Sequence, residues 1–120
     1  MTDMTDPELS ARHCAPRSTA LDPAACAALL AQLPAWTIEG GKLCRSFAFR
    51  NYYQTLAFVN ALAYMTHAQD HHPELTVGYN ACAARYDTHS AGGLTENDFI
   101  CAAKADALYS AGAHAAAVPA

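Results

Sequence analysis

Two pairs of short apolar stretches, each pair joined by a tight turn, constrain the fold of this chain most. The stretches cover residues 36–38, 43–49, 75–79 and 82–89. Gly40-Gly41 supplies the first turn and Asn80 the second, and in the second pair apolar residues alternate with small or polar ones. Alternation is typical of strands with one buried face, and strands joined by so short a turn run antiparallel. The chain is therefore predicted to form two β-hairpins.

Three helices are predicted around these hairpins. They cover residues 23–33, residues 52–69 and a final segment that ends near residue 110. The start signals are Asp22 before Pro23, Asn51 with Gln54, and Thr95 with Asp98. Such residues satisfy the free backbone N–H groups of a first helical turn. Phe58, Leu62 and Met65 recur at helical spacing in the second helix, which gives it an apolar face.

The predicted order is α-β-β-α-β-β-α, an α+β fold with a four-stranded antiparallel sheet and three helices on one face. Residues 1–20 are expected to form a mobile N-terminal arm, residues 21–112 the domain, and residues 113–120 a frayed tail. Helices on one side leave the other face and the sheet edges uncovered. Exposed edges are readily paired across a twofold axis, so we expect a homo-oligomer.

Composition narrows the functional classes. The 120 residues carry a formal charge of −4 and have no basic stripe, so nucleic acid and acidic membranes are not expected as partners. No apolar run is long enough to cross a bilayer. The five cysteines form no Cys-x-x-Cys motif and are interpreted as free thiols of a protein in the reducing cytoplasm. A small, neutral substrate fits these properties best.

Four of the six histidines, His67, His71, His72 and His89, lie within about thirty residues. Imidazole has an ordinary pKa of about 6.5, so it exchanges protons near neutral pH. His71 and His72 fall at a predicted helix-to-strand junction, because a residue before Pro73 is disfavoured in a helix. His89 falls beside the Gly92-Gly93 loop. The placement predicts a cleft for acid–base chemistry.

A metal site is the alternative interpretation of this cluster. His67 and His71 have the i, i+4 spacing that can place two imidazoles on one helical face. However, no glutamate follows His67 as in the helical zinc protease motif, and the nearby carboxylates are only Asp70, Glu74 and Asp87. We therefore favour a site without metal.

The histidine segment resembles the signature of the pterin-4a-carbinolamine dehydratase family. That signature runs from a charged residue through His-His-Pro and an aromatic residue to a histidine and a later aspartate. The matching residues are His67, His71-His72-Pro73, Tyr79, His89 and Asp98. The resemblance extends from about Asp22 to Tyr109 and includes Trp36 and the Ala57-Phe58-Val59-Asn60 segment.

The resemblance implies a hydro-lyase that needs no metal or cofactor and assembles as homodimers or homotetramers. Its reaction is the loss of water from 4a-hydroxytetrahydropterin to give quinonoid dihydropterin, which recycles the tetrahydrobiopterin used by aromatic amino acid hydroxylases. Such a hydroxylase would be a functional partner. The alternative is a non-catalytic dimerisation or assembly factor of the same fold. Animal members of the family also stabilise dimers of a homeodomain transcription factor, and some bacterial relatives act as assembly factors with degraded active sites.

The resemblance also implies the site. His71, His72 and His89 are the expected catalytic set. We assign His71 and His89 as general acids at the leaving hydroxyl, and His72 as the group that orients the ring or accepts the N5 proton. The residues expected to contact the pterin are His71, His72, Pro73, Thr88, His89, Ser90 and Ala91.

Three further residues are candidates for orienting the imidazoles: Asp70, Asp87 and His67. For Asp98, the capping box with Thr95 is a sufficient explanation, and we favour that structural role. His67 is a departure, since the best-known members carry a carboxylate there. A neutral imidazole would not raise the pKa of nearby histidines as a carboxylate can, so a shifted pH profile is expected.

Overall fold

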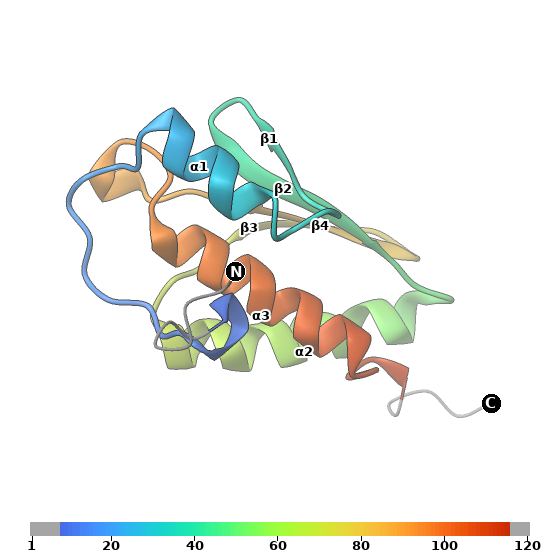
Figure 1. Cartoon of the computed structure of the whole chain (residues 1–120). Coiled ribbons are helices and arrows are strands. Elements are labelled where there is room, and N and C mark those ends of the chain that lie inside the picture. The colour runs from blue at the N-terminus through green and yellow to red at the C-terminus, as the bar shows by residue number, and fades with distance from the viewer. Residues whose placement is uncertain (1–7, 116–120) are drawn as a thin grey trace.

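The computed structural model describes residues 8–115 (Figure 1). Its elements, in chain order, are η1 (Leu9–Ala11), α1 (Pro23–Leu30), β1 (Thr37–Glu39), β2 (Lys42–Ala48), α2 (Tyr52–Gln69), β3 (Glu74–Val77), β4 (Ala81–Tyr86), η2 (His89–Ala91) and α3 (Glu96–Ser110). This order of α-helices and strands confirms the predicted α-β-β-α-β-β-α arrangement. None of the helices in residues 8–115 has the length and apolar character needed to cross a membrane.

All four strands belong to one antiparallel sheet, in the order β1-β2-β4-β3. The two hairpins therefore meet through β2 and β4, where Phe47 is opposite Cys82. Side chains that alternate along these central strands enter the core, and Leu43, Phe47, Cys82, Ala84 and Tyr86 are fully buried. The predicted alternation is confirmed here.

The fourth strand is shorter than predicted. It ends at Tyr86 instead of reaching His89. Beyond Tyr86 the chain leaves the sheet, Thr88 forms an isolated bridge with Gly93, and His89–Ala91 turn into the 3-10 helix η2. Gly92 adopts a left-handed conformation with φ of 73°, which closes this loop and which glycine adopts without strain.

The predicted helix caps are present. The carboxylate of Asp22 accepts the Ala25 N–H at 2.8 Å, and the amide oxygen of Asn51 accepts the Gln54 N–H at 3.0 Å. The Asn51 box is only half closed, because the Gln54 side chain accepts the Arg50 N–H instead of the Asn51 N–H. α1 ends at Leu30, earlier than predicted, although Pro34 follows it as expected.

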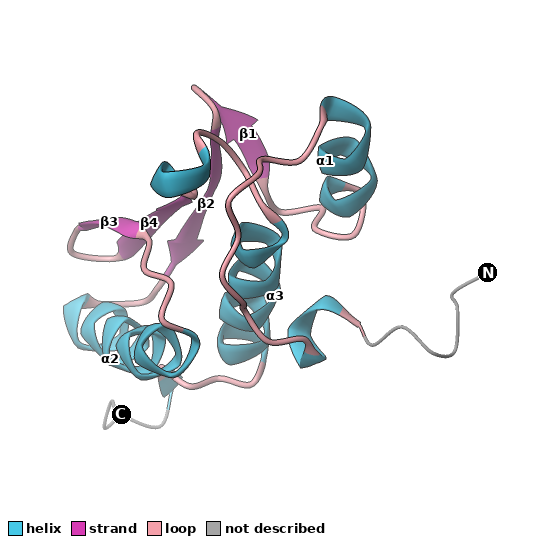
Figure 2. Cartoon of the chain, turned by 90° about the vertical axis from the view of Figure 1, so that its left-hand side faces the viewer, coloured by secondary structure: helices cyan, strands magenta, loops and turns pink. Residues whose placement is uncertain are grey.

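α2 and α3 pack on each other and on the same face of the sheet, while α1 lies beside β1 (Figure 2). Phe58 and Leu62 of α2 are fully buried, as predicted. Phe58 contacts Phe47 of β2 with ring centroids 4.6 Å apart, and Tyr109 of α3 meets Phe47 edge to face at 5.2 Å. One core between the sheet and the helices thus holds the elements that carry the histidines.

The second part of the predicted mobile arm is packed in the structure. We call residues 8–20 the arm segment. Leu9 is buried, and the side-chain amide of Asn97 on α3 pairs with the backbone of Ala15 through two hydrogen bonds of 2.7 and 3.1 Å. Arg12 also pairs with Glu96 at 2.9 Å. The remaining residues of the predicted arm, 1–7, lie outside the described residues.

The predicted tail is also partly packed. His114 meets Phe49 and Tyr109, with ring centroids 5.0 and 5.2 Å apart. Packing against two aromatic rings thus fixes residues just past the end of α3 to the core. Residues 116–120 of the predicted tail lie outside the described residues.

Candidate active site

His71 and His72 lie at the predicted junction between α2 and β3. α2 ends at Gln69, and Asp70 takes a left-handed conformation with φ of 51° that turns the chain out of the helix. Aspartate is one of the few residues other than glycine that tolerate this conformation. The turn directs His71 inward, where its side chain is 13% exposed, and leaves His72 exposed before Pro73.

A buried carboxylate holds His71. The imidazole Nε2 lies 2.6 Å from Oδ1 of Asp98, whose side chain is fully buried. The other oxygen, Oδ2, accepts the Thr88 hydroxyl at 2.8 Å and the Thr95 N–H at 2.9 Å. This second bond completes the predicted capping box of α3. Asp98 therefore caps the helix, as we favoured, and also binds the histidine, which the sequence did not indicate.

The electrostatic result is a histidine that favours its protonated form. The hydrogen bond to Asp98 is the main cause that raises the pKa of His71 above its ordinary value. Burial acts in the opposite direction, and the charges of Asp98 and Asp87 add to the increase. A larger fraction of His71 is thus cationic near neutral pH than of a free imidazole.

Tyr86 forms a flat support for His71. The two rings stack with an interplanar angle of 10° and centroids 6.0 Å apart. Burial raises the pKa of Tyr86 well above its usual value, so its hydroxyl stays neutral. Among the described residues this buried hydroxyl has no hydrogen-bond partner. Tyr86 therefore positions the imidazole by packing alone.

His89 borders the site from another element, η2. Thr88, directly before it, is buried and fixed by Asp98 and by the Thr95 hydroxyl at 2.8 Å. His89 and Ser90 themselves are exposed. One buried threonine thus anchors the loop that presents His89, and the same carboxylate fixes both this loop and His71.

The three histidines border one pocket of about 490 Å³, which we call the histidine pocket. Its lining residues are Lys42, Asp70, His71, His72, Pro73, Glu74, Asp87, Thr88, His89 and Ser90. The structure thus brings together every predicted pterin-contacting residue except Ala91. A volume of this size suits a small bicyclic molecule, since ligand pockets commonly measure about 300–1,000 Å³.

A second hollow of about 300 Å³, the arm cavity, adjoins the histidine pocket. Its lining residues are Cys14, Ala15, Pro16, Arg17, Gln69, Asp70, His71, Thr88, Ser90 and Asn97. Asp70, His71, Thr88 and Ser90 border both spaces. This hollow was not predicted from the sequence, because the arm was expected to be mobile and the contact between Ala15 and Asn97 spans most of the chain.

The remaining predicted residues have different positions. Asp70 and Asp87 line the histidine pocket, but the carboxylate bonded to His71 is that of Asp98. His67 is exposed in the last turn of α2 and borders neither space. Because the helix ends before His71, the i, i+4 spacing does not put the two imidazoles on one face. Across residues 8–115 no three His, Cys, Asp or Glu side chains gather to hold a metal.

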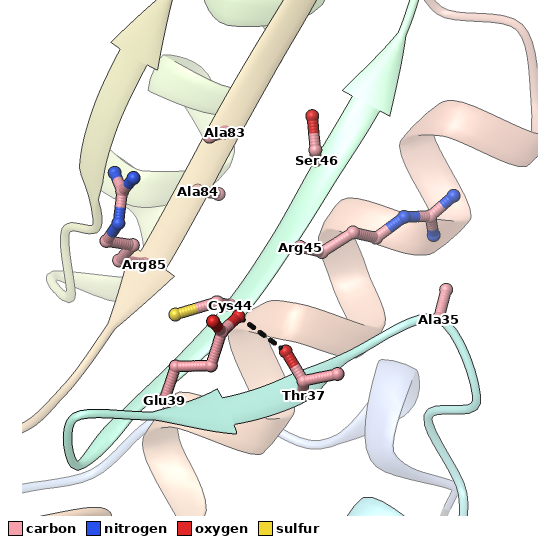
Figure 3. A pocket seen from close by; sticks show the side chains of 9 residues that line it. All are labelled: Ala35, Thr37, Glu39, Cys44, Arg45, Ser46, Ala83, Ala84 and Arg85. Atoms are coloured by element: carbon pink, nitrogen blue, oxygen red, sulfur yellow. Dashed lines mark hydrogen bonds between the residues drawn. The ribbon is translucent and has the colours of Figure 1, made fainter.

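A third hollow, of about 360 Å³, lies over β1, β2 and β4 on the side of the sheet away from the helices (Figure 3). Thr37, Glu39 and Cys44 point into this space, with a hydrogen bond of 2.9 Å from the Thr37 hydroxyl to Glu39. Burial raises the pKa of the Cys44 thiol, which disfavours the nucleophilic thiolate. The described lining of this third hollow contains no histidine. The histidine pocket is therefore the candidate active site.

Comparison with known proteins identifies the family of this chain. Residues 19–108 match the family model described as pterin 4 alpha carbinolamine dehydratase. A protein of Nitrosospira multiformis with the provisional name pterin-4-alpha-carbinolamine dehydratase is 48% identical over 110 residues, which cover 89% of this chain and 97% of that protein. A Bdellovibrio bacteriovorus protein with the same provisional name is 50% identical over 109 residues, 88% of this chain and 91% of its own.

Two solved structures share the fold. The transcriptional coactivator/pterin dehydratase from Brucella melitensis superimposes with a TM-score of 0.72 at 29% identity, over 75% of this chain and 98% of that one. A pterin dehydratase-like protein described as a RuBisCO assembly factor in the alpha-carboxysome gives a TM-score of 0.55 at 31% identity, over 62% and 88%. With this fold, this pocket and these relatives, the chain belongs to the pterin-4-alpha-carbinolamine dehydratase family.

Proposed function

We propose that the protein dehydrates 4a-hydroxytetrahydropterins to quinonoid dihydropterins. The observation that carries the proposal is the hydrogen bond between His71 and Asp98, because His71 borders the same pocket as His72 and His89. A raised pKa keeps His71 protonated at neutral pH more often than a free imidazole. A protonated imidazole is the group needed to help a poor leaving group depart. Membership of the family supplies the substrate class.

In the proposed reaction the bond between C4a and its hydroxyl oxygen breaks, and the electron pair leaves with the oxygen. His71 and His89 are the acids assigned to this oxygen, and one proton from them lets it depart as water. His72 accepts the proton of N5, whose electrons form the new double bond to C4a. One proton is donated and one is removed, so exchange with solvent restores the site.

The hydrogen bond to Asp98 also suggests which atom of His71 reacts. Nε2 is already engaged by Oδ1 of Asp98, so Nδ1 would be the nitrogen that serves the substrate. Asp98 would then act as an orienting carboxylate that stabilises the imidazolium, as in a catalytic triad. Stacking on Tyr86 holds the plane of the ring, which lowers the cost of alignment before the reaction.

The proposal is tested by stopped-flow measurement of 4a-hydroxytetrahydropterin decay. The protein should accelerate decay over buffer, and His72→Ala or His89→Ala should each lower kcat by about 10²–10⁴-fold, the usual contribution of a positioned acid or base. His67→Ala is the matched control, because this histidine is exposed and borders neither hollow. No acceleration by the wild type, or full acceleration by the double variant of His72 and His89, would refute the proposal.

A second candidate function is that of a non-catalytic assembly factor, and one observation favours it. The structure at a TM-score of 0.55 is described as a RuBisCO assembly factor. A protein with only that role would not need His71, His72 and His89 around one pocket. The same decay measurement separates the two functions, since an assembly factor would leave the rate equal to that in buffer.

A further inference from the structure

We propose that Cys14 and Cys101 are a reversible redox pair, which a peroxide oxidises to a disulfide between the arm segment and α3. Both residues have free thiols in the structure, and their sulfur atoms lie 3.5 Å apart. A disulfide bond measures about 2.05 Å, so the two side chains together must close about 1.5 Å. The inference goes beyond the proposed dehydration and does not depend on it.

The arm segment runs along one face of α3 and places the two cysteines opposite each other (Figure 2). Positions 97, 101 and 104 recur at helical spacing, so their side chains share this face. Asn97 pairs with Ala15 through two hydrogen bonds, and Lys104 donates to the Ser10 carbonyl at 2.9 Å. Along α3 the cysteine pair lies between these two contacts. Anchors on both sides thus hold the two sulfurs together.

Cys14 is the sulfur that an oxidant reaches first. It is half-buried and lines the arm cavity of about 300 Å³, whereas Cys101 is buried and is not part of that lining. The hydrogen bond from Cys101 is the main cause that lowers the pKa of Cys14, and the charges of His71 and Lys104 add to the decrease. Burial and the charge of Asp98 oppose it. A lowered pKa favours the thiolate, which is the form that reacts with peroxides.

The other three cysteines have the opposite property. Burial is the main cause that raises the pKa of Cys26, Cys44 and Cys82, so their thiols stay protonated. Cys44 resembles Cys14 in position, because it is half-buried and lines a hollow, the third one described above. It therefore provides a matched control within the same chain.

The proposed oxidation has two steps. The Cys14 thiolate attacks one oxygen of hydrogen peroxide and becomes a sulfenic acid, while the O–O bond breaks and the other oxygen leaves as hydroxide, which a proton converts to water. The Cys101 sulfur then attacks the sulfenic sulfur, and its thiol proton leaves with the displaced oxygen as water. Two thiols and one peroxide thus give one disulfide and two waters. A dithiol reductant returns both thiols by exchange.

The disulfide also changes the charge next to the candidate active site. The Cys14 thiolate is one of the causes that raise the pKa of His71, after the hydrogen bond and charge of Asp98 and ahead of the charge of Asp87. Cys101 contacts the same residue, with 3.8 Å between its sulfur and the His71 carbonyl oxygen. Because a disulfide carries no charge, oxidation should lower the pKa of His71. The redox state of the pair thus sets the protonated fraction of this histidine.

Peptide mapping tests the pair directly, because trypsin separates the five cysteines into five peptides. Cys14 lies in residues 13–17 and Cys101 in residues 86–104. After treatment with hydrogen peroxide, a single chain should be two hydrogen atoms lighter, and mass spectrometry should find these two peptides joined. A dithiol should separate them. Before oxidation, iodoacetamide should label Cys14 at least about tenfold faster than Cys44, since one pKa unit changes the thiolate fraction about tenfold.

Three variants separate the roles of the two sulfurs. Cys14→Ser should abolish the joined peptide. Cys101→Ala should form the sulfenic acid more slowly, because it loses the hydrogen bond that lowers the pKa of Cys14, and should leave that acid unresolved for trapping by dimedone. Cys44→Ser is the matched control and should still give the joined peptide. A peroxide-treated wild type without this peptide, or equal labelling rates for Cys14 and Cys44, would overturn the redox pair.

NMR titration of the imidazole resonances tests the effect on the site. The oxidised wild type and the reduced Cys14→Ser variant should both show a lower pKa of His71 than the reduced wild type. Peroxide should cause no further decrease in Cys14→Ser, and reduced Cys44→Ser should match the reduced wild type. A pKa of His71 that stays the same after complete oxidation would overturn the effect of the pair on this histidine.

Discussion

Asp98 is the residue on which the site depends most. One of its oxygens binds His71, and the other binds the Thr88 hydroxyl and the Thr95 N–H. A buried carboxylate is costly unless its lone pairs are used, and here each oxygen has a partner. The stabilisation of α3, of the η2 loop and of the imidazole is thus concentrated in one side chain.

Replacing Asp98 with asparagine should lower the pKa of His71, as followed by its imidazole resonances in NMR titrations. The hydrogen bond to Asp98 is the largest cause of the increase, and the charge of Asp87 is among the smaller ones. Asp87→Asn should therefore lower the same pKa by less. Equal decreases in the two variants would contradict the assignment.

The same pair makes stability depend on pH. A histidine whose pKa is raised by folding adds stability below its unfolded pKa of about 6.5, and loses it as the pH rises through the folded pKa. The difference in unfolding free energy between wild type and Asp98→Asn should therefore be larger at pH 6 than at pH 8.5. Urea unfolding at the two pH values measures it, and a difference that grows with pH would contradict this expectation.

Removing the phenolic hydroxyl of Tyr86 and that of Tyr109 gives a matched pair of variants. The buried Tyr86 hydroxyl has no partner among the described residues, while the Tyr109 hydroxyl donates to the Ala48 carbonyl at 2.7 Å. Tyr86→Phe should leave the unfolding free energy unchanged or raise it by about 1 kcal/mol, and Tyr109→Phe should lower it by about 1 kcal/mol. Thermal unfolding ranks the two variants, and a reversed order would be inconsistent with these contacts.

At the scale of elements, local signals in the sequence were sufficient for most boundaries. α2 covers the predicted residues 52–69, and α3 begins at the Thr95 box and ends at Ser110. Caps, turns and alternation depend on residues a few positions apart, so they can be read from sequence. The 3-10 helix η2 could not be predicted in this way, because it depends on the bridge from Thr88 to Gly93 and on the hydrogen bond from Thr88 to Asp98.

The arm segment shows more clearly that local sequence signals cannot predict contacts between distant parts of the chain. The prolines and scattered charges of residues 1–20 suggested a mobile stretch, yet Ala15 pairs with Asn97, 82 positions away. The bond from His71 to Asp98 spans 27 positions. The structure brings the predicted histidines together. From the sequence, however, the carboxylate that binds one of them was predicted only to cap a helix. When a residue has one partner nearby in the sequence and another far away, local sequence patterns predict only the nearby partner.

Removing the Asn97 amide should loosen the arm segment. Asn97→Ala deletes the bonds to Ala15 and Arg17, and each buried bond is worth about 1 kcal/mol. Trypsin should then cleave after Arg12 and Arg17 about tenfold or more faster, because cleavage follows the open population. Mass spectrometry identifies the products, and Asn60→Ala, on the exposed side of α2, is the control. Equal cleavage rates in both variants would show that this amide does not anchor the arm.

At the scale of the whole molecule, the helices cover one face of the sheet and leave β1 and β3 as its edges (Figure 2). Unpaired edge strands favour association with a second chain. We therefore still predict a homodimer or homotetramer. Sedimentation equilibrium should give the mass of two or four chains at micromolar concentration, and a single-chain mass across that range would contradict the prediction.

The three hydrogen bonds of Asp98 have a consequence for interpreting relatives of this protein. A descendant that lost the dehydration chemistry would still need a carboxylate at this position to start α3, so selection for folding alone would preserve it. Its presence in a related chain is thus poor evidence of activity. His72 and His89 are exposed, and few structural demands would retain them after the chemistry was lost. The surface histidines, more than the buried aspartate, should distinguish enzymes from scaffolds in this family.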